Sequence, residues 1–318
     1  MAIVAAKAAP TNRLFAATCR SDFSRDRSTS PLTVTVNQKH KYGVTMRLIA
    51  SLVAAFLCIV SLSGCASSTA AAQSALKPDA PTVFVTGSNR GLGLEFARQY
   101  AAKGWNVIAT ARRPEASAEL QALVAEYPQV VLDTLDVTVQ ADVDRVATRF
   151  RDQPIDVLIN NAGIWGDLDA QTFGTLDYDA YQWIYAVNAI GPLRVTEALL
   201  ANVEMSQQKK IIVLGGGMGT RRTVEQAPGG HYWYRMSRAA NLISMAIVQR
   251  ETKKRGVIVG IISPGKVDTQ MLKDSGWPAH FKKINPADSA GFVIEQIALL
   301  TPENGGELIN YDGKVIGW

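Results

Sequence analysis

Residues 81–95 carry the feature that most limits the fold, an apolar, β-rich run that breaks into a glycine-rich turn and then a helix-like stretch. The segment reads PTVFVTGSNRGLGLE, with Gly87, Gly91 and Gly93 inside the turn. In this context the loop predicts dinucleotide binding, because the first glycine permits a tight turn and the later ones let backbone N–H groups approach a pyrophosphate. Glycine clusters also mark ordinary turns, so the downstream sequence decides between the two interpretations.

The chain downstream of the loop alternates β-rich runs with stretches of helix length. Strands separated by helices predict parallel pairing through right-handed crossovers. We therefore expect an α/β fold, a single doubly wound (Rossmann) domain with a central parallel sheet, over residues 81–318. The predicted strands are 83–86, 106–111, 130–136, 157–160, 211–214, 257–263 and 307–311; the predicted helices are 94–103, 116–127, 141–152, 177–201, 237–255 and 286–300.

The positive charge is concentrated at the N-terminus. The formal net charge is +5, yet eight Lys and Arg and only two Asp precede residue 65, so the rest is close to neutral. A protein that binds nucleic acid needs a basic face on its folded domain, and we expect no nucleic-acid partner. No cysteine follows Cys65, so the domain has neither an internal disulfide nor a cysteine-based metal site, and we expect no metal.

The N-terminal region resembles a bacterial lipoprotein signal. Met46-Arg47 precedes the apolar run LIASLVAAFLCIVSL, whose length suits a signal-peptide core, and the run ends in LSGC at Cys65. We expect signal peptidase to cut before Cys65, whose thiol then carries lipid and holds the protein on the membrane, facing the periplasm. Residues 1–45 are predicted to be an unstructured or mis-started extension, 46–65 the signal peptide and 66–80 a tether. The alternatives are a retained anchor helix and a cytoplasmic location.

Further motifs follow the glycine loop in a fixed order. LDV (135–137) ends the third predicted strand and NNAG (160–163) ends the fourth. Asn188 lies in the context AVNAIGP, and PGKVDT (264–269) follows the sixth strand. Singly, each motif is also explained by strand capping or loop punctuation. Together they resemble the short-chain dehydrogenase/reductase family, and the C-terminal YDGKVIGW is similar to its carbonyl-reductase-like, C-factor-like branch.

The resemblance implies a nicotinamide cofactor, and the end of the second strand predicts which one. Enzymes that prefer the unphosphorylated form place an acidic residue there, whereas this chain has Arg112 and Arg113. Arg112 and Arg90 suit a 2′-phosphate by charge, so NADP is expected, with NADPH preferred over NADH. The alternative is that Arg112 and Arg113 are solvated loop residues. The cofactor-binding residues implied are Gly87, Ser88, Asn89, Arg90, Gly91, Leu92, Gly93, Arg112, Asp136, Val137, Asn161, Ala162, Gly163, Tyr234, Arg238, Pro264, Gly265, Val267 and Thr269.

The catalytic set of the family is only partly present. Its tyrosine matches Tyr234 and its asparagine matches Asn188, but Arg238 stands at the lysine position and Gly216 at the serine position. Arg238 keeps the positive charge, although a guanidinium does not release a proton near neutral pH. The backbone of the triple glycine, Thr220, Tyr232 and His231 are candidate replacements for the lost hydroxyl. Trp165, Met218, Trp233 and Met271 are candidates for lining the pocket.

Two functions remain open from the sequence. The first is an NADP-dependent oxidoreductase that transfers hydride between the cofactor and a small carbonyl or alcohol, with Tyr234 as acid/base and Arg238 and Asn188 beside it. The second is a non-catalytic nucleotide-binding sensor or scaffold of the cell envelope, suggested by the joint loss of serine and lysine. An exported protein would also lack access to NADPH, which favours the second function if the signal is cleaved. The oligomeric state is left open.

Overall fold

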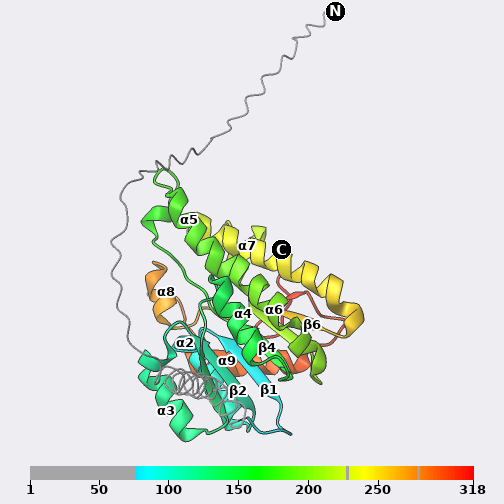
Figure 1. Ribbon diagram of the computed structural model, residues 1–318. Coiled ribbons are helices and arrows are strands. Elements are labelled where there is room, and N and C mark those ends of the chain that lie inside the picture. Colours follow the sequence, from blue (N-terminus) through cyan, green and yellow to red (C-terminus); the bar gives the residue numbers. More distant parts are fainter. Residues whose placement is uncertain (1–75, 227–228, 278–279) are drawn as a thin grey trace, which may run out of the picture. The chain divides into compact units, whose positions relative to one another are not determined.

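The computed structural model describes residues 76–226, 229–277 and 280–318, which lie within one compact unit (Figure 1). The predicted extension (1–45), the signal peptide with Cys65 (46–65) and residues 66–75 of the tether lie outside the described residues. In the part of the chain that the structure describes, no helix is long and apolar enough to cross a membrane. Those same residues also contain no group of three or more His, Cys, Asp or Glu that could hold a metal ion.

A seven-stranded parallel sheet forms the centre of the described unit, in the order β3-β2-β1-β4-β5-β6-β7. The order reverses between β1 and β4, which is the switch point where doubly wound folds place their ligands. The predicted fold class is therefore confirmed. The strands are β1 Thr82–Thr86, β2 Asn106–Ala111, β3 Val130–Thr134, β4 Val157–Asn160, β5 Lys210–Leu214, β6 Ile258–Ser263 and β7 Leu308–Asn310.

Helices cover both faces of the sheet because successive strand side chains point to opposite sides. Val83 and Val85 belong to one buried cluster and Phe84 to the other. The first cluster includes side chains of α2, α3 and α9, and the second those of α4, α6 and α7. The helices are α2 Gly91–Ala102, α3 Ala118–Glu126, α4 Gln140–Arg149, α5 Tyr178–Tyr185, α6 Gly191–Met205, α7 Tyr232–Thr252, α8 Gln270–Asp274 and α9 Pro286–Leu299.

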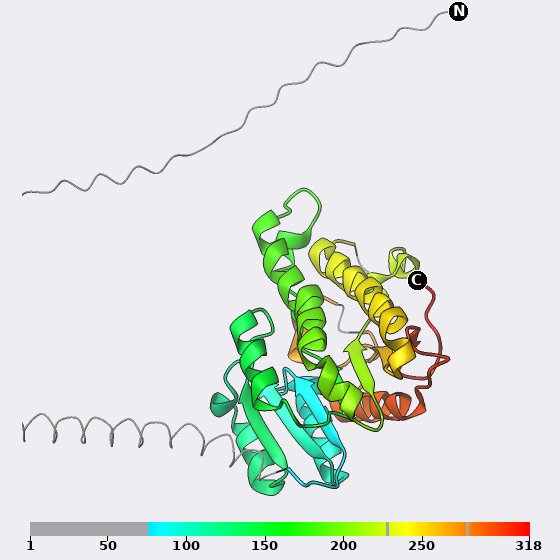
Figure 2. The same ribbon diagram turned by 45° about the vertical axis from the view of Figure 1, so that its right-hand side comes forward.

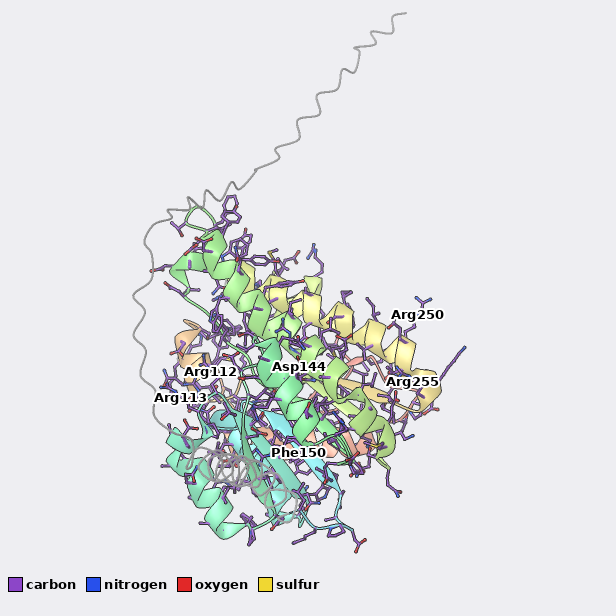
Figure 3. All side chains as sticks on the ribbon, in the orientation of Figure 1. Arg112, Arg113, Asp144, Phe150, Arg250 and Arg255 are labelled. Carbon is purple, nitrogen blue, oxygen red and sulfur yellow. The ribbon has the colours of Figure 1, made fainter. Side chains whose placement is uncertain are left out.

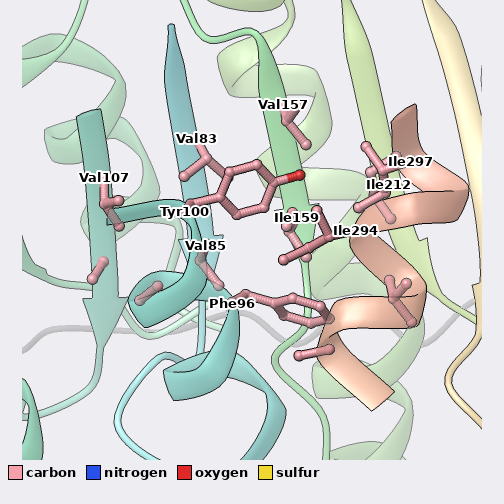
Figure 4. Close-up of a cluster of buried hydrophobic side chains, with 14 of the residues drawn as sticks. Val83, Val85, Phe96, Tyr100, Val107, Val157, Ile159, Ile212, Ile294 and Ile297 are labelled. Carbon is pink, nitrogen blue, oxygen red and sulfur yellow. The ribbon is translucent and has the colours of Figure 1, made fainter. Parts of the chain in front are cut away.

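The core under the glycine loop is built from two helices far apart in sequence. Phe96 of α2 is fully buried, Ile294 of α9 is nearly so, and both pack over Val85 and Ile159 of the sheet (Figure 4). Burying one such side chain contributes about 1.5–3 kcal/mol. Asn285 begins α9, since its side-chain oxygen accepts a hydrogen bond from the Ala287 N–H at 2.8 Å. This packing fixes α2 over β1, and with it the entry to the loop.

The long helix predicted at 177–201 is interrupted. α5 runs into a π-helical turn, η3 (Ala186–Ile190), before α6 continues alongside α7 (Figure 2). Pro192, at the start of α6, has no N–H to donate to the preceding turn, which accounts for a break at this place. π-helical turns are often found at functional sites, and this one contains Asn188.

Most other boundaries differ from the prediction by a few residues, and the start of α7 matters most for the site. α7 begins at Tyr232 instead of residue 237, so its first turn contains Tyr234. Residues 76–80, which the sequence assigns to the tether, are hydrogen-bonded to the domain: Asn106 Nδ2 donates to the Lys77 and Ala80 carbonyls at 2.8 and 3.1 Å. The short helix α8 was not predicted, because five residues are too few to establish a helical period.

Candidate functional site

The glycine loop joins β1 to α2 in a conformation that requires its glycines. Gly87 and Gly91 have φ of +68° and +55°, the left-handed region that favours glycine. A Cβ at Gly93 would lie 2.2 Å from the Gly87 carbonyl oxygen, so no other residue fits without a backbone shift. Ser88 of the loop is fully buried and its hydroxyl donates to the Val85 carbonyl at 2.9 Å. Its side chain therefore stabilises the turn.

The end of β4 fixes the loop from the other side of the switch point. Asn161 Nδ2 donates to the carbonyls of Thr86 and Gly87 at 2.8 and 3.0 Å. The backbone N–H groups of Asn161 and Ala162 both donate to Thr86 Oγ1 at 3.0 Å. Asn161 and Ala162, predicted to bind cofactor, are thus placed as supports of the glycine loop.

The N-terminus of α2 suits an anionic group. Arg90 precedes the helix, makes no side-chain capping hydrogen bond, and no acidic residue occupies the first turn. The first N–H groups of such a helix have no partner within the helix and carry partial positive charge, which is the arrangement that binds phosphate. A dinucleotide pyrophosphate therefore fits the residues present at this position. Asn89 and Leu92 lie on either side of Arg90 and Gly91, where α2 begins.

The PGKVDT segment lies against this loop. A Cβ at Gly91 would meet Thr269 Cγ2 at 3.4 Å, so Thr269 borders the helix N-terminus. Gly265 has φ of +81°, and a Cβ there would lie 2.8 Å from the Tyr311 ring. Val267 is buried and pairs with Ile284, and Pro264 accepts a hydrogen bond from the Ser289 hydroxyl at 2.8 Å. The structure thus brings the segment and the glycine loop together.

The residues predicted for the adenosine end are either exposed or hydrogen-bonded to neighbouring protein groups. Arg90 is exposed. Arg112 and Arg113, labelled in Figure 3, are exposed as well. Asp136 Oδ1 accepts hydrogen bonds from the N–H and hydroxyl of Thr138 at 2.9 and 2.7 Å, so this carboxylate caps its own turn. Val137 is buried, and its carbonyl accepts from an Arg194 guanidinium at 2.8 Å. These contacts leave the cofactor roles of Asp136 and Val137 as predictions.

Tyr234 and Arg238 lie one turn apart on α7 and face the end of β4. The Arg238 guanidinium carbon is 5.0 Å from the centre of the Tyr234 ring, and its Nη1 donates to the Leu214 carbonyl at 3.3 Å. A Cβ at Gly163 would lie 2.7 Å from Arg238 Nη2, so this glycine makes room for the arginine. Arg238 Nε is buried without a hydrogen-bond partner among the described residues, which leaves a donor for a bound group.

Asn188 connects η3 to the same cluster. Its Oδ1 accepts from the Ile164 N–H and its Nδ2 donates to the Ile164 carbonyl, both at 2.9 Å. Nδ2 also donates to the Ser237 hydroxyl at 3.1 Å. Asn188 is fully buried, so its amide holds together the end of β4 and the first turns of α7.

Gly216 lies just after β5 and has open space where a Cβ would be. Its backbone is extended, with φ of −177°, a conformation that any residue adopts. A Cβ at Gly216 would meet nothing within 4 Å, whereas one at Gly215 would press on Ile261 and one at Gly217 on Thr223. The position therefore has room for a serine side chain.

The candidate replacements for that hydroxyl are differently engaged. The Thr220 hydroxyl is directed to the Gly217 carbonyl at 2.8 Å, and the side chain is buried. Tyr232 stacks on Phe173 at the surface, with ring centres 5.9 Å apart. His231 is buried, and burial, followed by the nearby Arg235, lowers the pKa of its imidazole.

Two aromatic residues named as pocket candidates are buried against Tyr234 and its helix. The Trp165 ring stacks on the Tyr234 ring with centres 3.8 Å apart and an interplanar angle of 24°. Trp233 Nε1 donates to the Ala170 carbonyl at 2.8 Å. Gln171, which was not among the predicted site residues, also contacts this cluster. Its Oε1 accepts from the Tyr234 N–H at 2.8 Å, and its Nε2 donates to the Trp165 carbonyl at 2.9 Å. A single glutamine in a polar loop carries no sequence signal for such a role.

Known proteins with similar sequences indicate the same kind of protein as the fold and the glycine loop do. A family model described as short chain dehydrogenase matches residues 81–277. The chain is 31% identical over 241 residues to 1-hydroxy-2-glutathionyl-2-methyl-3-butene dehydrogenase of Rhodococcus sp. (strain AD45), covering 74% of this chain and 99% of the relative. It is 32% identical over 173 residues to C-signal of Myxococcus xanthus, covering 54% of this chain and 98% of the relative.

Solved structures give the same result. NADPH-bound carbonyl reductase from chicken fatty liver superposes with a TM-score of 0.69 at 27% identity, over 75% of this chain and 99% of that one. A short-chain dehydrogenase/reductase from Burkholderia multivorans with bound NADP gives 0.66 at 26% identity, over 75% and 100%. The matched family model and the parallel sheet with its glycine loop lead to one conclusion. The chain belongs to the short-chain dehydrogenase family of oxidoreductases.

Proposed function

We propose that the protein is an NADP-dependent reductase that converts a small carbonyl compound to the alcohol, or catalyses the reverse reaction. One observation carries the proposal: residues 161–163 touch both halves of the site. Asn161 is hydrogen-bonded to Gly87 in the glycine loop, and Gly163 makes room for Arg238 beside Tyr234. A nucleotide held by the loop would therefore extend toward the Tyr234–Arg238 pair. NADP-bound relatives of the same fold support this cofactor.

The chain's own residues supply binding and proton transfer. The α2 N-terminus would hold the pyrophosphate, and Arg112 and Arg90 the 2′-phosphate. The bound cofactor supplies the hydride in carbonyl reduction. The Tyr234 hydroxyl donates a proton to the carbonyl oxygen, and the positive charge of Arg238 stabilises the tyrosinate that results. Solvent must then reprotonate Tyr234, because a guanidinium does not pass on a proton near neutral pH.

The test is binding followed by turnover in the same cuvette. NADPH and NADH are titrated separately, and absorbance at 340 nm is then followed with a panel of aldehydes, ketones and quinones. We expect tighter binding of NADPH and oxidation of NADPH by at least one substrate class. Tyr234→Phe is the matched control, since it keeps the ring that stacks on Trp165 and removes the proton donor. A wild-type protein that binds NADPH but never oxidises it would overturn the proposed reaction.

A second function is favoured by the same site. Gly216 offers no hydroxyl and Arg238 offers no transferable proton, which suits a nucleotide-binding sensor that has lost hydride transfer. The double variant Gly216→Ser with Arg238→Lys separates the two functions. An inactive wild type whose activity appears in the double variant supports the sensor. A wild type that turns over excludes it, whether or not the double variant is faster.

We also propose that the protein is anchored to the membrane in the cell envelope through lipidated Cys65. The LSGC sequence and the apolar run before it support this location. Mass spectrometry of the Cys65 peptide tests the proposal, because a diacylglycerol thioether adds a defined mass. An unmodified peptide from a retained leader would overturn it and favour the cytoplasmic alternative.

A further inference from the structure

Tyr234 lies in the first turn of α7, where helices fray, so something outside the helix must hold its ring in place. The Trp165 indole covers one face of the phenol ring, with centres 3.8 Å apart. Trp165 comes from the loop that follows β4, two residues after Gly163. The ring contact therefore ties the tyrosine to the end of the sheet independently of the helix backbone.

Trp165 is itself held by a specific hydrogen bond. Its Nε1–H donates to His231 Nδ1 at 3.2 Å, and the two rings meet edge to face with centres 5.2 Å apart. An indole nitrogen can only donate, so His231 Nδ1 must be the acceptor and the neutral imidazole carries its proton on Nε2. Both rings are buried, and an indole N–H without this acceptor would be left unpaired.

His231 is fixed where this acceptor is needed. Its φ is +58°, the left-handed region, and it directly precedes α7. Its carbonyl accepts the Arg235 N–H at 2.8 Å, which locks it to the first turn of the helix. Burial lowers the pKa of the imidazole, which keeps Nδ1 unprotonated and able to accept at neutral pH. A rarely populated backbone conformation at a buried histidine is the kind of feature that accompanies a positioning role.

We propose that His231 and Trp165 are positioning residues for Tyr234: His231 orients the indole, and the indole orients the phenol. Neither needs to touch the reacting atoms. The inference rests on the proposed function, in which Tyr234 donates the proton. Losing the Nδ1 acceptor would let Trp165 rotate to find another partner, and Tyr234 would lose the surface that fixes its hydroxyl. Small misplacements of a reacting group reduce rate strongly without weakening cofactor binding.

Two variants at one position separate this role from a general structural one. His231→Gly and His231→Asn both accept the left-handed backbone. Asparagine places an acceptor oxygen where His231 has Nδ1, whereas glycine removes it. We expect kcat to fall about tenfold or more in the glycine variant, with KM for NADPH within about twofold of wild type, and to recover in the asparagine variant. Loss of kcat and NADPH affinity together, or no recovery with asparagine, would overturn the inference.

A second measurement does not depend on turnover. The chain has six tryptophans, and the indole N–H signal of Trp165 in a ¹⁵N-labelled sample is assigned as the one absent in Trp165→Phe. We expect this signal to shift or broaden in His231→Gly and to stay near its wild-type position in His231→Asn. An unchanged signal in the glycine variant would refute the hydrogen bond from Trp165 to His231. If the wild type has no activity, the proposed function fails, while the spectrum still tests whether His231 holds Trp165.

Trp105 provides a matched control for the loss of an indole. It packs on Tyr100 with ring centres 4.8 Å apart. Trp105 directly precedes β2 and so lies where the parallel strands begin, whereas Tyr234 lies near the residues that follow the end of β4. We expect Trp105→Phe to leave kcat unchanged and Trp165→Phe, which keeps a flat ring but loses the N–H, to lower it. Equal effects of the two substitutions would overturn the positioning role of Trp165.

Discussion

Restoring a hydroxyl at residue 216 is the sharpest perturbation that the structure offers. Gly216 has an extended backbone, with φ of −177° and ψ of 147°, and an added Cβ meets nothing within 4 Å. Substitution therefore introduces no strain or clash. Replacing a glycine whose conformation suits other residues stabilises a protein by about 0.4–1 kcal/mol, because the unfolded chain loses freedom. We expect Gly216→Ser and Gly216→Ala to fold at least as stably as wild type.

The two variants differ only in the hydroxyl, which isolates its effect on catalysis. A single donor to the developing oxyanion is worth about 2.7–4 kcal/mol, or about 10²–10³ in rate. We therefore expect kcat of Gly216→Ser to exceed that of Gly216→Ala by about 10²–10³, while Gly216→Ala stays close to wild type. The assay is NADPH oxidation at saturating carbonyl substrate, with NADPH affinity measured in parallel. Equal kcat for both variants, with unchanged NADPH affinity, would refute the idea that residue 216 faces the carbonyl oxygen.

Four other outcomes follow from contacts described above. Gly93→Ala places a Cβ 2.2 Å from the Gly87 carbonyl oxygen, so calorimetry should find NADPH binding lost; wild-type affinity would contradict the close packing of the loop. Arg112→Asp should weaken NADPH binding about 10–100-fold and spare NADH, since each charge-assisted hydrogen bond contributes about 1.5–3 kcal/mol; equal losses for both cofactors would exclude a 2′-phosphate contact. Arg238→Met should reduce kcat about 10²-fold or more while Arg238→Lys retains turnover, and a fully active methionine variant would rule out a need for the cation. The pKa of His231 is lowered in the folded protein, so its contribution to stability is present above its ordinary pKa of 6.5 and declines as the pH falls below that value. Between pH 7.5 and 5.5 the melting temperature should therefore fall less in His231→Asn than in wild type. Equal pH dependence of the two melting temperatures would count against a neutral, buried imidazole.

Much of the fold could be predicted because strand and turn signals in this chain are local. β2 and β4 have the predicted bounds, and the remaining strands differ by a few residues at most. Errors fall where the backbone departs from regular helical geometry. The π-helical turn at Ala186–Ile190 lies just before Pro192, and the early start of α7 directly follows His231, whose backbone is left-handed. Neither is encoded in hydrophobic periodicity.

The candidate site divides in the same way. Motif order predicted that the glycine loop, Asn161 and Tyr234 come together, and the structure places Asn161 against the loop and Arg238 beside Tyr234. Side-chain pairings across the fold could not be read from the sequence, because they depend on distances between segments far apart in the chain. The stack of Trp165 on Tyr234 is one such pairing, and it joins two residues that are 69 positions apart in the sequence.

The hydrogen bonds from Asn161 to the glycine loop also have a consequence for the order of events during synthesis. Asn161 leaves the ribosome 75 residues after Thr86, which corresponds to roughly 4–15 s at ordinary elongation rates. Until then β1 lacks its neighbour β4 and the loop lacks the amide that holds it. A nascent chain that ends before β4 leaves one edge of β1 unpaired, and an unpaired strand edge is prone to aggregation. Nucleotide binding needs the loop that Asn161 holds, so a bound nucleotide would stabilise chains that include β4 and Asn161 and not chains that end before them.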